Sequence, residues 1–460
     1  MTQPMTKEIA ITDTYQGGKV PFRPGNPDAI RVYCCGPTVY SAPHIGNARA
    51  GVVADQMVRL LREVYGREAV TYARNLTDID DKIIKTAAEE GVEIEVVTAR
   101  ATAAYLADLD ALGCARPDLM PRATENIEPM IAMMQRLLES GHAYAEQGHV
   151  LFSTEAFEDY GKLSRLDQDA LIAGARVEVA PYKKAPTDFV LWKPAKEGEP
   201  GWDTPDDWGL GGKGRPGWHL ECSAMIEAGL GAPIDLHLGG NDLRFPHHEN
   251  EIAQSCCSAD LGGVPLARHW MHNGMLRMGE DKMSKSLGNI VTPGELLEDW
   301  HGEVLRMALL SAQYRQPLEW SEELLAASKT QLDKFYRAAG DAEPGEVSSS
   351  VLGAMCDDLN TPAAFAAMHE LREQAQAGNA EAASGLRAAG QLLGLMNETA
   401  DAWAKGGASD DDARIDALLV ERAEARAAKN FARSDEIRDQ LAAEGIVIED
   451  GAGGATWRRA

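Results

Sequence analysis

Apolar and polar positions in the first part of the chain predict strands and helices in alternation. Residues 30–36 are mostly apolar and end at Gly-Pro, which is typical of a buried strand. Apolar residues near helical spacing cover 44–65, and a second strand at 69–73 leads into an acidic turn and another helix. This order of elements predicts an α/β fold with a parallel sheet.

The pattern changes near residue 125, which indicates an insertion into the α/β unit. A helix over 127–140 precedes short strands and a stretch at 196–217 that is rich in Gly, Pro and Trp. The sheet pattern returns at 233–240, and the chain beyond Gly302 is largely helical. The last segment follows the pattern helix, helix, strand, turn, strand, which predicts a small C-terminal α/β domain.

Composition narrows the class of protein. The 460 residues, 44% of them hydrophobic, predict two to four globular domains. No run approaches the ~18 apolar residues of a membrane span, and the N-terminus lacks the layout of a signal peptide, so we expect a cytoplasmic protein with no membrane partner. The net charge of −26 argues at first against a nucleic-acid partner, yet a local basic strip can still bind phosphates.

Two short motifs about 240 residues apart are suited to nucleotide binding. Lys282 and Lys285 belong to a glycine-flanked loop with hydroxyl side chains, which suits polyphosphate, although such a loop on its own is more often a solvated surface. Upstream, His44 opens a helix whose N-terminus offers free N–H groups and a positive dipole. Gly46 would let a flat adenine or a phosphate approach closely. The two motifs together are far more specific than either alone.

This pair resembles the HIGH and KMSKS signatures of the class I aminoacyl-tRNA synthetases. The resemblance implies that His44, Lys282 and Lys285 hold ATP, with its Mg²⁺, and stabilise charge at the α-phosphate as a carboxylate attacks it. The resemblance also implies a catalytic role for the last position of the first motif, which is Asn47 here. This residue departs from the family's motif, because its amide donates hydrogen bonds but carries no charge.

A second part of the nucleotide site follows the strand at 233–240. The run GGND resembles the nucleotide-binding turn of the same family. The resemblance implies that Asp242 meets the ribose hydroxyls. The residues implied in ATP binding are then His44, Gly46, Gly239, Gly240, Asp242 and Lys285.

Cysteine, histidine and glutamate side chains could also hold a metal ion. The seven cysteines are scattered and odd in number, unlike a secreted disulfide framework, and burial is favoured for any single one. Cys35 ends the first strand, and Cys222 lies in the run GWHLECS. His247 and Glu251 are four apart and share a helix face, while His248 and Glu251, three apart, are also possible. Such a set suits Zn²⁺, although helix-capping histidines and buried cysteines would explain the same residues.

Five runs, CGPTVY, RNLTDIDDKI, RPGWHLECSAM, FPHHENEIAQ and KMSKSLGN, together resemble the cysteinyl-tRNA synthetases, and the similarity extends over nearly the whole chain. The resemblance implies ATP-dependent activation of L-cysteine and its transfer to tRNA(Cys), by a protein we expect to be a monomer. It implies one Zn²⁺ per chain, which would favour a soft thiolate over the hydroxyl of serine and make an editing site unnecessary. The implied zinc ligands are Cys35, Cys222, His247 and Glu251.

The same resemblance places Thr77, Trp218 and His237 in the cysteine pocket. Trp218 could equally be a core aromatic residue. The acidic run around Asp80 could suggest Mg²⁺ ligands, but a helix-start cap is the favoured interpretation. The cysteines that match no ligand position are expected to be structural; they are Cys34, Cys114, Cys256, Cys257 and Cys356.

The tail resembles the anticodon-binding end of the family. From residue 412 onward it carries eight basic residues against ten acidic ones, a net charge of −2, while the rest of the chain carries −24. Four basic residues at helical spacing could form a stripe, unless a helix break near Asn430 splits it. Trp457 offers a stacking surface for an unpaired base, or else fills a small core. The predicted tRNA contacts are Arg422, Arg426, Arg433, Trp457 and Arg458.

The expected architecture is a Rossmann-like parallel-sheet catalytic domain split by an insertion, then a helical region and a C-terminal α/β domain. The expected segments are 1–124 and 217–275 (catalytic domain), 125–216 (insertion), 276–340 (KMSKS loop and stem contact), 341–404 (helical bundle) and 405–460 (anticodon binding). Two alternatives stay open: a ligase that passes cysteine to a small amine, and a non-catalytic zinc-dependent RNA-binding protein. The tail beyond Leu359 argues against the first. The presence of His44, Lys282, Lys285 and all four candidate zinc ligands argues against the second.

Overall fold

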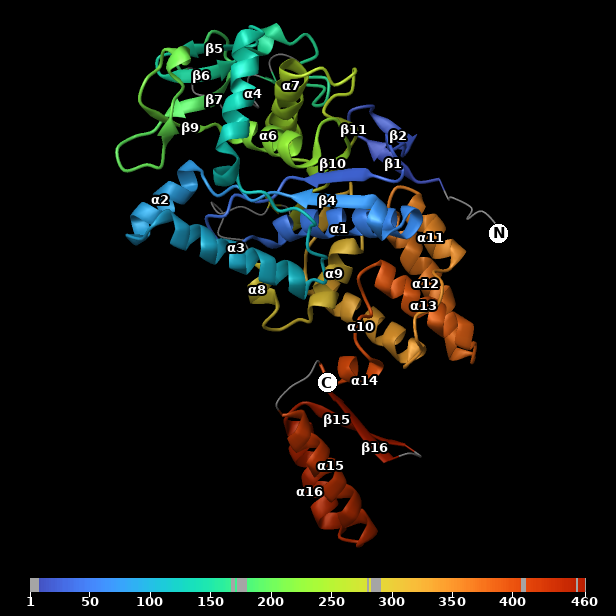
Figure 1. The fold of residues 1–460 in the computed structure, drawn as a ribbon. Helices are drawn as coiled ribbons and strands as arrows, with labels where there is room; N and C mark the ends of the chain where they lie inside the picture. The colour runs from blue at the N-terminus through green and yellow to red at the C-terminus, as the bar shows by residue number, and fades with distance from the viewer. Residues whose placement is uncertain are drawn as a thin grey trace.

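The structure is a computed structural model and describes residues 8–166, 170–171, 180–278, 281–282, 291–406, 411–451 and 454–459, with only the backbone of 281–282, 449, 451, 454 and 459. Figure 1 shows a large body that contains the N-terminus and a smaller C-terminal lobe that projects from it.

A four-stranded parallel sheet forms the centre of the large body. Its order is β11-β10-β3-β4, with β3 (Ile30–Cys34), β4 (Val70–Arg74), β10 (Ile234–Gly240) and β11 (Ala267–Asn273). Every residue of β10 is buried, as expected for a parallel strand covered on both faces. The α/β fold and the strands predicted at 30–36, 69–73 and 233–240 are confirmed.

Helices connect these strands and cover the sheet. The predicted helix at 44–65 is α1 (Ile45–Tyr65), which joins β3 to β4. Two helices, α2 (Asp81–Glu90) and α3 (Ile94–Ala111), follow β4, while α6 (Trp218–Leu230) precedes β10 and α7 (Glu249–Ser258) follows it. An N-terminal hairpin of β1 (Ala10–Asp13) and β2 (Gly18–Pro21) was not predicted, because its two strands have only four residues each.

The insertion forms a separate layer above the sheet in Figure 1. It contains α4 (Ile127–Glu139) and an antiparallel sheet of order β5-β6-β7-β9-β8. Its core is built around Trp192, Phe152 and the buried methionines of α4. The strands are β5 (Ala143–Glu146), β6 (His149–Phe152), β7 (Phe189–Pro194), β8 (Trp202–Asp203) and β9 (Lys213–Pro216).

After β11 the chain forms a short sheet of order β13-β12-β14 and then a largely helical region, as predicted. Arg306 ties this region to α1, since its buried guanidinium donates to Asp55 at 2.5 Å and to the carbonyl of Leu393 at 2.6 Å. The elements are β12 (Leu276–Met278), β13 (Asp281–Lys282), β14 (Leu318–Glu319), α8 (Pro293–Leu296), α9 (Gly302–Leu310), α10 (Glu322–Ala339), α11 (Ser349–Cys356), α12 (Thr361–Gln376), α13 (Ala380–Leu392) and α14 (Ala400–Ala404).

The C-terminal lobe has the predicted order of two helices and two strands. It consists of α15 (Asp412–Ala427), α16 (Phe431–Ala443), β15 (Ile446–Gly451) and β16 (Gly454–Arg459), with an antiparallel strand pair. Ile415, Leu419, Ile437, Leu441 and Trp457 form a small core that is separate from the core of the large body. The lobe therefore has its own packing.

Single helical turns complete the described chain. They are η1 (Arg67–Ala69), η2 (Ala123–Asn126), η3 (Thr154–Ala156), η4 (Asp206–Trp208) and the π turn η5 (Arg244–His248) before α7. None of the helices in the described part of the chain has the length and hydrophobicity needed to cross a bilayer.

Candidate active site

The candidate metal ligands meet at the carboxyl edge of the central sheet, beside the junction of β3 and β10. The connections from these two strands leave in opposite directions along the sheet, and ligands commonly bind at such a switch point. Cys35 follows β3 directly, and Cys222 lies on α6. His247 comes from η5 and Glu251 from the first turn of α7.

The four side chains present their ligand atoms to one another at distances that suit a metal ion. Cys35 Sγ lies 3.6 Å from Cys222 Sγ and 3.3 Å from Glu251 Oε1, and His247 Nε2 lies 3.0 Å from the same oxygen. All four ligand atoms lie within 4.8 Å of one another. A tetrahedral ion with ligand distances of about 2.0–2.3 Å spaces its ligands roughly 3.3–3.8 Å apart. The sulfurs are too far apart for a disulfide, whose S–S bond is about 2.05 Å.

Burial sets the protonation of these groups. It lowers the pKa of His247 to about 3 against the opposing effect of Glu251, which leaves a neutral imidazole able to ligate. Burial raises the pKa of Glu251, but His237 and His247 outweigh it and the net pKa is lowered, so the carboxylate is charged. Burial and the neighbouring Cys222 raise the pKa of Cys35 well above its usual value. The cluster thus holds acceptor groups beside thiols that a divalent cation would deprotonate.

His248, the alternative ligand, lies in a second overlapping set with Cys35, His237 and Glu251. Its Nε2 is 3.9 Å from Glu251 Oε1, against 3.0 Å for His247. Its Nδ1 contacts His272 Nε2 at 2.8 Å. The second set also lacks Cys222 and so offers one thiol instead of two. The geometry and the softer donors favour the set with His247.

Further side chains hold the candidate ligands in place. His237 Nε2 lies 2.8 Å from Glu251 Oε2, which leaves the other carboxylate oxygen toward the sulfurs. His219 Nδ1 lies 3.0 Å from His247 Nδ1, so the opposite nitrogen of His247 faces Glu251. Outer partners of this kind orient metal ligands in proteins. His219 had no signal in the sequence beyond its place in the run GWHLEC.

Of the residues expected around cysteine, Trp218 is 38% exposed and stacks on His247 with ring centroids 4.3 Å apart. Its interpretation as a core aromatic residue is therefore wrong. His237 and Thr77 are buried, and Thr77 Oγ1 donates to Glu221 Oε2 at 2.9 Å. Glu221 was missed by the sequence analysis, since nothing in the pattern of α6 marks this glutamate as buried. Burial raises its pKa well above the usual value.

Those residues expected to bind ATP that the structure describes lie at the same edge of the sheet, and two of their glycines stand close to histidine rings. The N–H of His44, at the N-cap of α1, donates to Asn47 Oδ1 at 3.2 Å. Asn47 thus caps the helix, which gives this departure from the motif a structural role. A Cβ on Gly46 would lie 2.8 Å from His44 Nδ1, and one on Gly239 would lie 2.6 Å from the ring of His248.

The remaining ATP residues are only partly described. Gly240 ends β10, where a Cβ would lie 2.4 Å from Oδ1 of Asp242, whose side chain is exposed. The backbone of Lys282 pairs with Arg277 between β13 and β12. Lys285 lies outside the described residues, so its predicted role stays a prediction.

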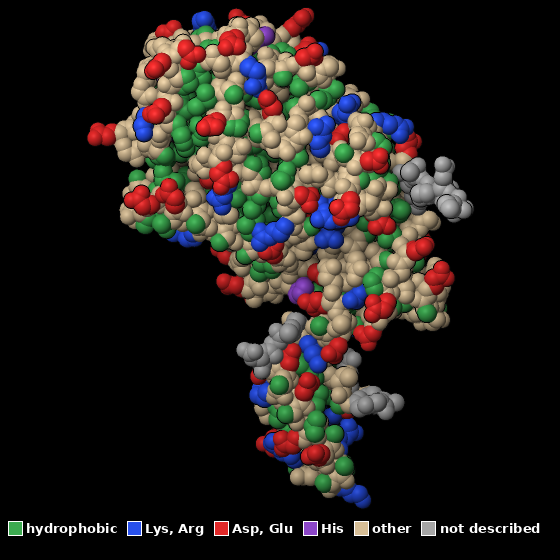
Figure 2. Space-filling model, in the orientation of Figure 1, with side chains coloured by type: hydrophobic (Ala, Val, Ile, Leu, Met, Phe, Trp, Pro, Cys, Tyr) green, Lys and Arg blue, Asp and Glu red, His purple; other side chains and the backbone are tan. Residues whose placement is uncertain are grey.

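The predicted tRNA contacts in the tail are mostly engaged within the lobe. Arg422 and Arg426 pair with Asp450 at 2.8 and 3.2 Å, and Arg433 pairs with Glu421 at 2.7 Å. The expected break is present, because α15 ends at Ala427 and α16 begins at Phe431. Figure 2 shows acidic and basic side chains interspersed on this lobe, without a continuous basic stripe on the visible face.

The prediction that Trp457 offers a stacking surface for an unpaired base is wrong. Its ring is 3% exposed within the core of the lobe, and its indole N–H donates to Asp416 at 2.7 Å. It offers no stacking surface, because the small core of a two-helix lobe needs a large side chain. The exposed aromatic residue is Phe431, at 62%, beside the turn that holds Lys429. In the sequence, the exposure of Phe431 could have been inferred from its place at the start of a helix, next to the predicted break near Asn430.

The acidic run behaves as predicted, while the structural role of the other cysteines stays a prediction. All seven cysteines are free, and Cys34 packs in a different cluster from Cys35. Asp80 caps α2, since its side chain accepts the N–H of Lys82 at 2.9 Å.

Comparisons with known proteins agree with this geometry. Residues 21–330 match the family described as tRNA synthetases class I (C) catalytic domain, 350–401 match the DALR domain, and 409–458 match the cysteinyl-tRNA ligase anticodon binding domain. Among solved structures, methionyl-tRNA synthetase of Mycobacterium tuberculosis with methionyl-adenylate has a TM-score of 0.58 at 17% identity, over 84% of this chain and 95% of that one. A leucyl synthetase–tRNA complex from Agrobacterium radiobacter gives 0.56 at 11%, over 81% and 84%. Fold and motifs therefore define a class I aminoacyl-tRNA synthetase.

Relatives identify the member of that class. The cysteine–tRNA ligase of Caulobacter vibrioides is 52% identical over 98% of this chain and 99% of its own length. That of Acidiphilium cryptum is 52% identical over 98% of this chain and its full length. The chain belongs to the cysteine–tRNA ligase family.

Proposed function

We infer that this chain joins L-cysteine to tRNA(Cys) in two steps. The carboxylate of cysteine attacks the α-phosphorus of ATP and releases pyrophosphate. A hydroxyl of the terminal ribose then attacks the cysteinyl carbonyl, loses its proton and displaces AMP. The observation that carries this proposal is the convergence of Cys35, Cys222, His247 and Glu251 at the sheet edge where α1 begins and β10 ends, in a chain of this family.

We propose that these four residues bind one Zn²⁺, since their donor atoms and spacings suit that ion. When bound, zinc would hold the substrate side chain as a thiolate, which serine cannot match. His219 and His237 orient His247 and Glu251 through the contacts at 3.0 and 2.8 Å. Trp218 and Thr77 are the proposed walls of the pocket for the rest of the amino acid.

The proposed nucleotide site comprises His44, Gly46, Gly239, Gly240 and Asp242, with Lys282 and Lys285 on the triphosphate and its Mg²⁺. This chemistry needs positioned charge and no covalent enzyme intermediate. The exposed carboxylate of Asp242 at the end of β10 suits the ribose hydroxyls. A monomeric state, a cytoplasmic location and the sequence-based segment boundaries also stay proposals.

Cysteine-dependent exchange of pyrophosphate into ATP, measured with and without tRNA, tests the function. We expect exchange with cysteine, none with serine, and loading of tRNA(Cys). Adenylation with transfer to a small amine alone would favour the amine ligase, which the match of 409–458 to an anticodon binding domain argues against. Absence of exchange in the folded, zinc-loaded protein would contradict the proposal and favour a non-catalytic RNA-binding protein.

A further inference from the structure

Arg49 is a buried arginine near the start of α1, and its charge has no carboxylate partner among the residues that the structure describes. The residue is 0% exposed, and burial alone lowers the pKa of its guanidinium to about 10. A buried charge is costly unless its hydrogen bonds are well satisfied. An arginine that only filled space at this position would therefore destabilise the protein relative to an apolar side chain of similar size.

The guanidinium of Arg49 binds three backbone carbonyl groups from two separate segments. One terminal nitrogen donates to the carbonyls of Gly274 and Met275 at 2.8 and 3.0 Å, and the other donates to that of Gln316 at 2.8 Å. Gly274 and Met275 lead into β12, and Gln316 precedes β14, the parallel neighbour of β12. A guanidinium presents its donors in a rigid, planar fork, so these bonds fix both the distance and the angle between α1 and the two strands.

The backbone that Arg49 binds is closely packed. The N–H of Leu318 donates to the carbonyl of Met275 at 3.1 Å, which joins the two strands. A Cβ on Gly274 would lie 2.5 Å from the carbonyl oxygen of Gln316. Because the atom in its way belongs to the backbone, a side chain at position 274 would push the start of β12 away from β14.

The chain returns to α1 after the KMSKS run. The N–H of Ile45, the first residue of α1, donates to the carbonyl of Val291 at 2.9 Å. Between these attachments, the backbone of Lys282 in β13 pairs with Arg277 in β12. The segment that carries the KMSKS run is thus bonded at both ends to the start of α1, the helix that His44 caps.

We propose that Arg49 is a positioning residue for the adenylation step, which holds the strands that carry Lys282 at a fixed distance from His44. The proposal rests on the proposed function, which assigns ATP to both of those residues. Arg49 is enclosed, so it acts through the backbone of β12 and not by touching ATP. Displacement of a reacting or stabilising group by about 1 Å can lower a rate about 100-fold, which is why a rigid fork is useful here.

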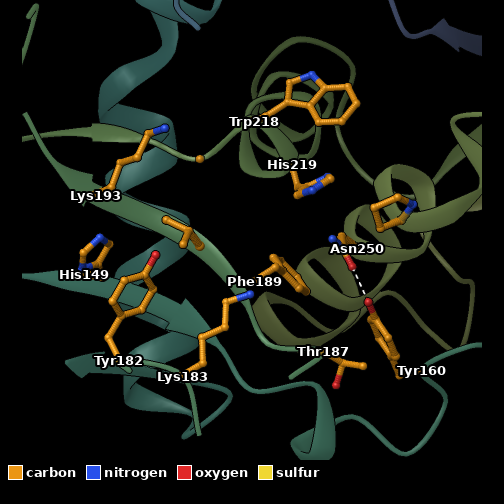
Figure 3. A pocket seen from close by; sticks show the side chains of 13 residues that line it. His149, Tyr160, Tyr182, Lys183, Thr187, Phe189, Lys193, Trp218, His219 and Asn250 are labelled. Atoms are coloured by element: carbon orange, nitrogen blue, oxygen red, sulfur yellow. Dashed lines mark hydrogen bonds between the residues drawn. The ribbon is translucent and has the colours of Figure 1, made fainter. Parts of the chain in front are cut away.

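The contacts of Arg49 are separate from the cysteine side of the site. Figure 3 shows a cavity of about 290 Å³ between the insertion and the start of α6, and neither Arg49 nor a residue that it binds lines this cavity. The candidate metal ligands are not among its partners either. Substitution of Arg49 should therefore change the rate of adenylate formation and leave zinc content and the KM for cysteine unchanged.

The test uses Arg49→Lys and Gly274→Ala, with Arg59→Lys as the matched control. Lysine keeps the charge but has no planar fork, whereas Gly274→Ala leaves Arg49 in place and displaces the strand. Arg59 is another arginine of α1 that donates to two backbone carbonyls, those of Gly113 and Gln391, at 2.8 and 3.1 Å. Its partners are neither in β12 nor in β14.

Three measurements are made on full-length, zinc-loaded protein. Cysteine-dependent pyrophosphate exchange gives kcat and the KM for cysteine, and metal analysis gives the zinc content. Each variant is also combined with Lys282→Ala, which shows whether the two changes act on the same contact. Tryptic cleavage after Lys282, without substrates and relative to cleavage after Lys405, reports how firmly the segment is held and does not depend on activity.

We expect kcat to fall roughly 10–100-fold in Arg49→Lys and Gly274→Ala, with zinc content and the KM for cysteine unchanged. Cleavage after Lys282 should be faster in both, and Arg59→Lys should have the wild-type kcat. In the Lys282→Ala background, the further loss should be less than about threefold, because the displaced group is already absent.

A wild-type kcat in Arg49→Lys, or an equal loss in Arg59→Lys, would overturn the proposal. So would a loss of zinc, a raised KM for cysteine, or losses that multiply with that of Lys282→Ala, since each would indicate a general effect on stability. Absence of exchange in the wild-type protein would instead contradict the proposed function, and the cleavage comparison would still decide whether Arg49 holds the segment.

Discussion

Around Glu251, ionisable groups from four separate segments meet in the interior and are satisfied by one another, whereas in the C-terminal lobe they pair on the surface. Glu251 is buried and contacts His237, His247 and Cys35 within 3.3 Å. Asp450 is about half exposed and pairs with Arg422 and Arg426 from the same lobe. Burying a charged carboxylate is costly unless it has partners such as these, whereas ion pairs of the second kind are stable in water.

The two regions therefore differ in how far each site is already formed before a ligand binds. In the cluster, the orientations of His247 and Glu251 are set by His219 and His237, so a metal ion would meet a preformed site. In the lobe, surface ion pairs are worth roughly 0–1 kcal/mol and can be exchanged for phosphate contacts. We therefore expect a single substitution to cause a large loss of activity in the cluster and a small loss of tRNA affinity in the lobe.

The largest effect is expected for Cys222→Ser. Loss of one thiolate donor should remove zinc from the purified protein and raise the KM for cysteine on the order of 100-fold or more, since even outer partners of a metal are worth 10–100-fold. Metal analysis and cysteine-dependent exchange measure both effects. Cys257→Ser is the control, because this cysteine packs in the insertion core and belongs to neither candidate ligand set. Normal zinc in Cys222→Ser would contradict the ligand assignment.

Deletion of residues 406–460 should have the next largest effect, and only on the tRNA step. The lobe has its own core, and Trp403 packs in the core of the large body, so the remaining protein should fold. The rate of cysteine-dependent pyrophosphate exchange should stay within about twofold of the rate for the full-length protein. Charging of tRNA should fall about 100-fold in kcat/KM, the equivalent of one or two stacked bases at about 1–3 kcal/mol each. Full-rate charging by the folded, truncated protein would disprove anticodon binding by the lobe.

The two regions also differ in how far the sequence predicts them. Strong periodicity predicted β3, α1, β4 and β10, and the described residues of the predicted nucleotide site lie at the start of α1 and at the end of β10. The ligand set could not be derived from spacing, because Cys35 and Cys222 are far apart in the chain and only the fold brings them to 3.6 Å. Family resemblance supplied that set. In the lobe, helices and strands were predicted correctly, but the exposure of Trp457 was not, because propensity does not determine which aromatic residue fills a small core.

A smaller effect is expected for Phe431→Ala, which tests the exposed aromatic residue of the lobe. The variant should bind tRNA(Cys) roughly 10-fold more weakly if an anticodon base stacks there, with the thermal stability of the lobe unchanged. Trp457→Ala provides the contrast, because emptying a buried aromatic site should destabilise the lobe by about 3–5 kcal/mol. Thermal unfolding separates the two variants. Wild-type tRNA affinity in Phe431→Ala would contradict the stacking role.

The smallest effect is expected for single charges on the same lobe, and Lys429→Ala against Arg433→Ala sharpens the comparison with the buried cluster. Lys429 stands in the turn between α15 and α16 with a φ of 59°, is exposed, and has no ion-pair partner in the part of the chain that the structure describes. Arg433, four residues on, binds Glu421 and Glu436 at 2.7 and 2.8 Å. A lysine that meets one phosphate releases about one counterion, so Lys429→Ala should lower tRNA affinity a few-fold at low salt and reduce the slope of log affinity against log salt by about 1. Arg433→Ala should change the slope less, because its charge is already offset by two carboxylates. A larger change in slope for Arg433→Ala would mean that these ion pairs open on binding and that the surface pairs of the lobe do not limit its contact with tRNA.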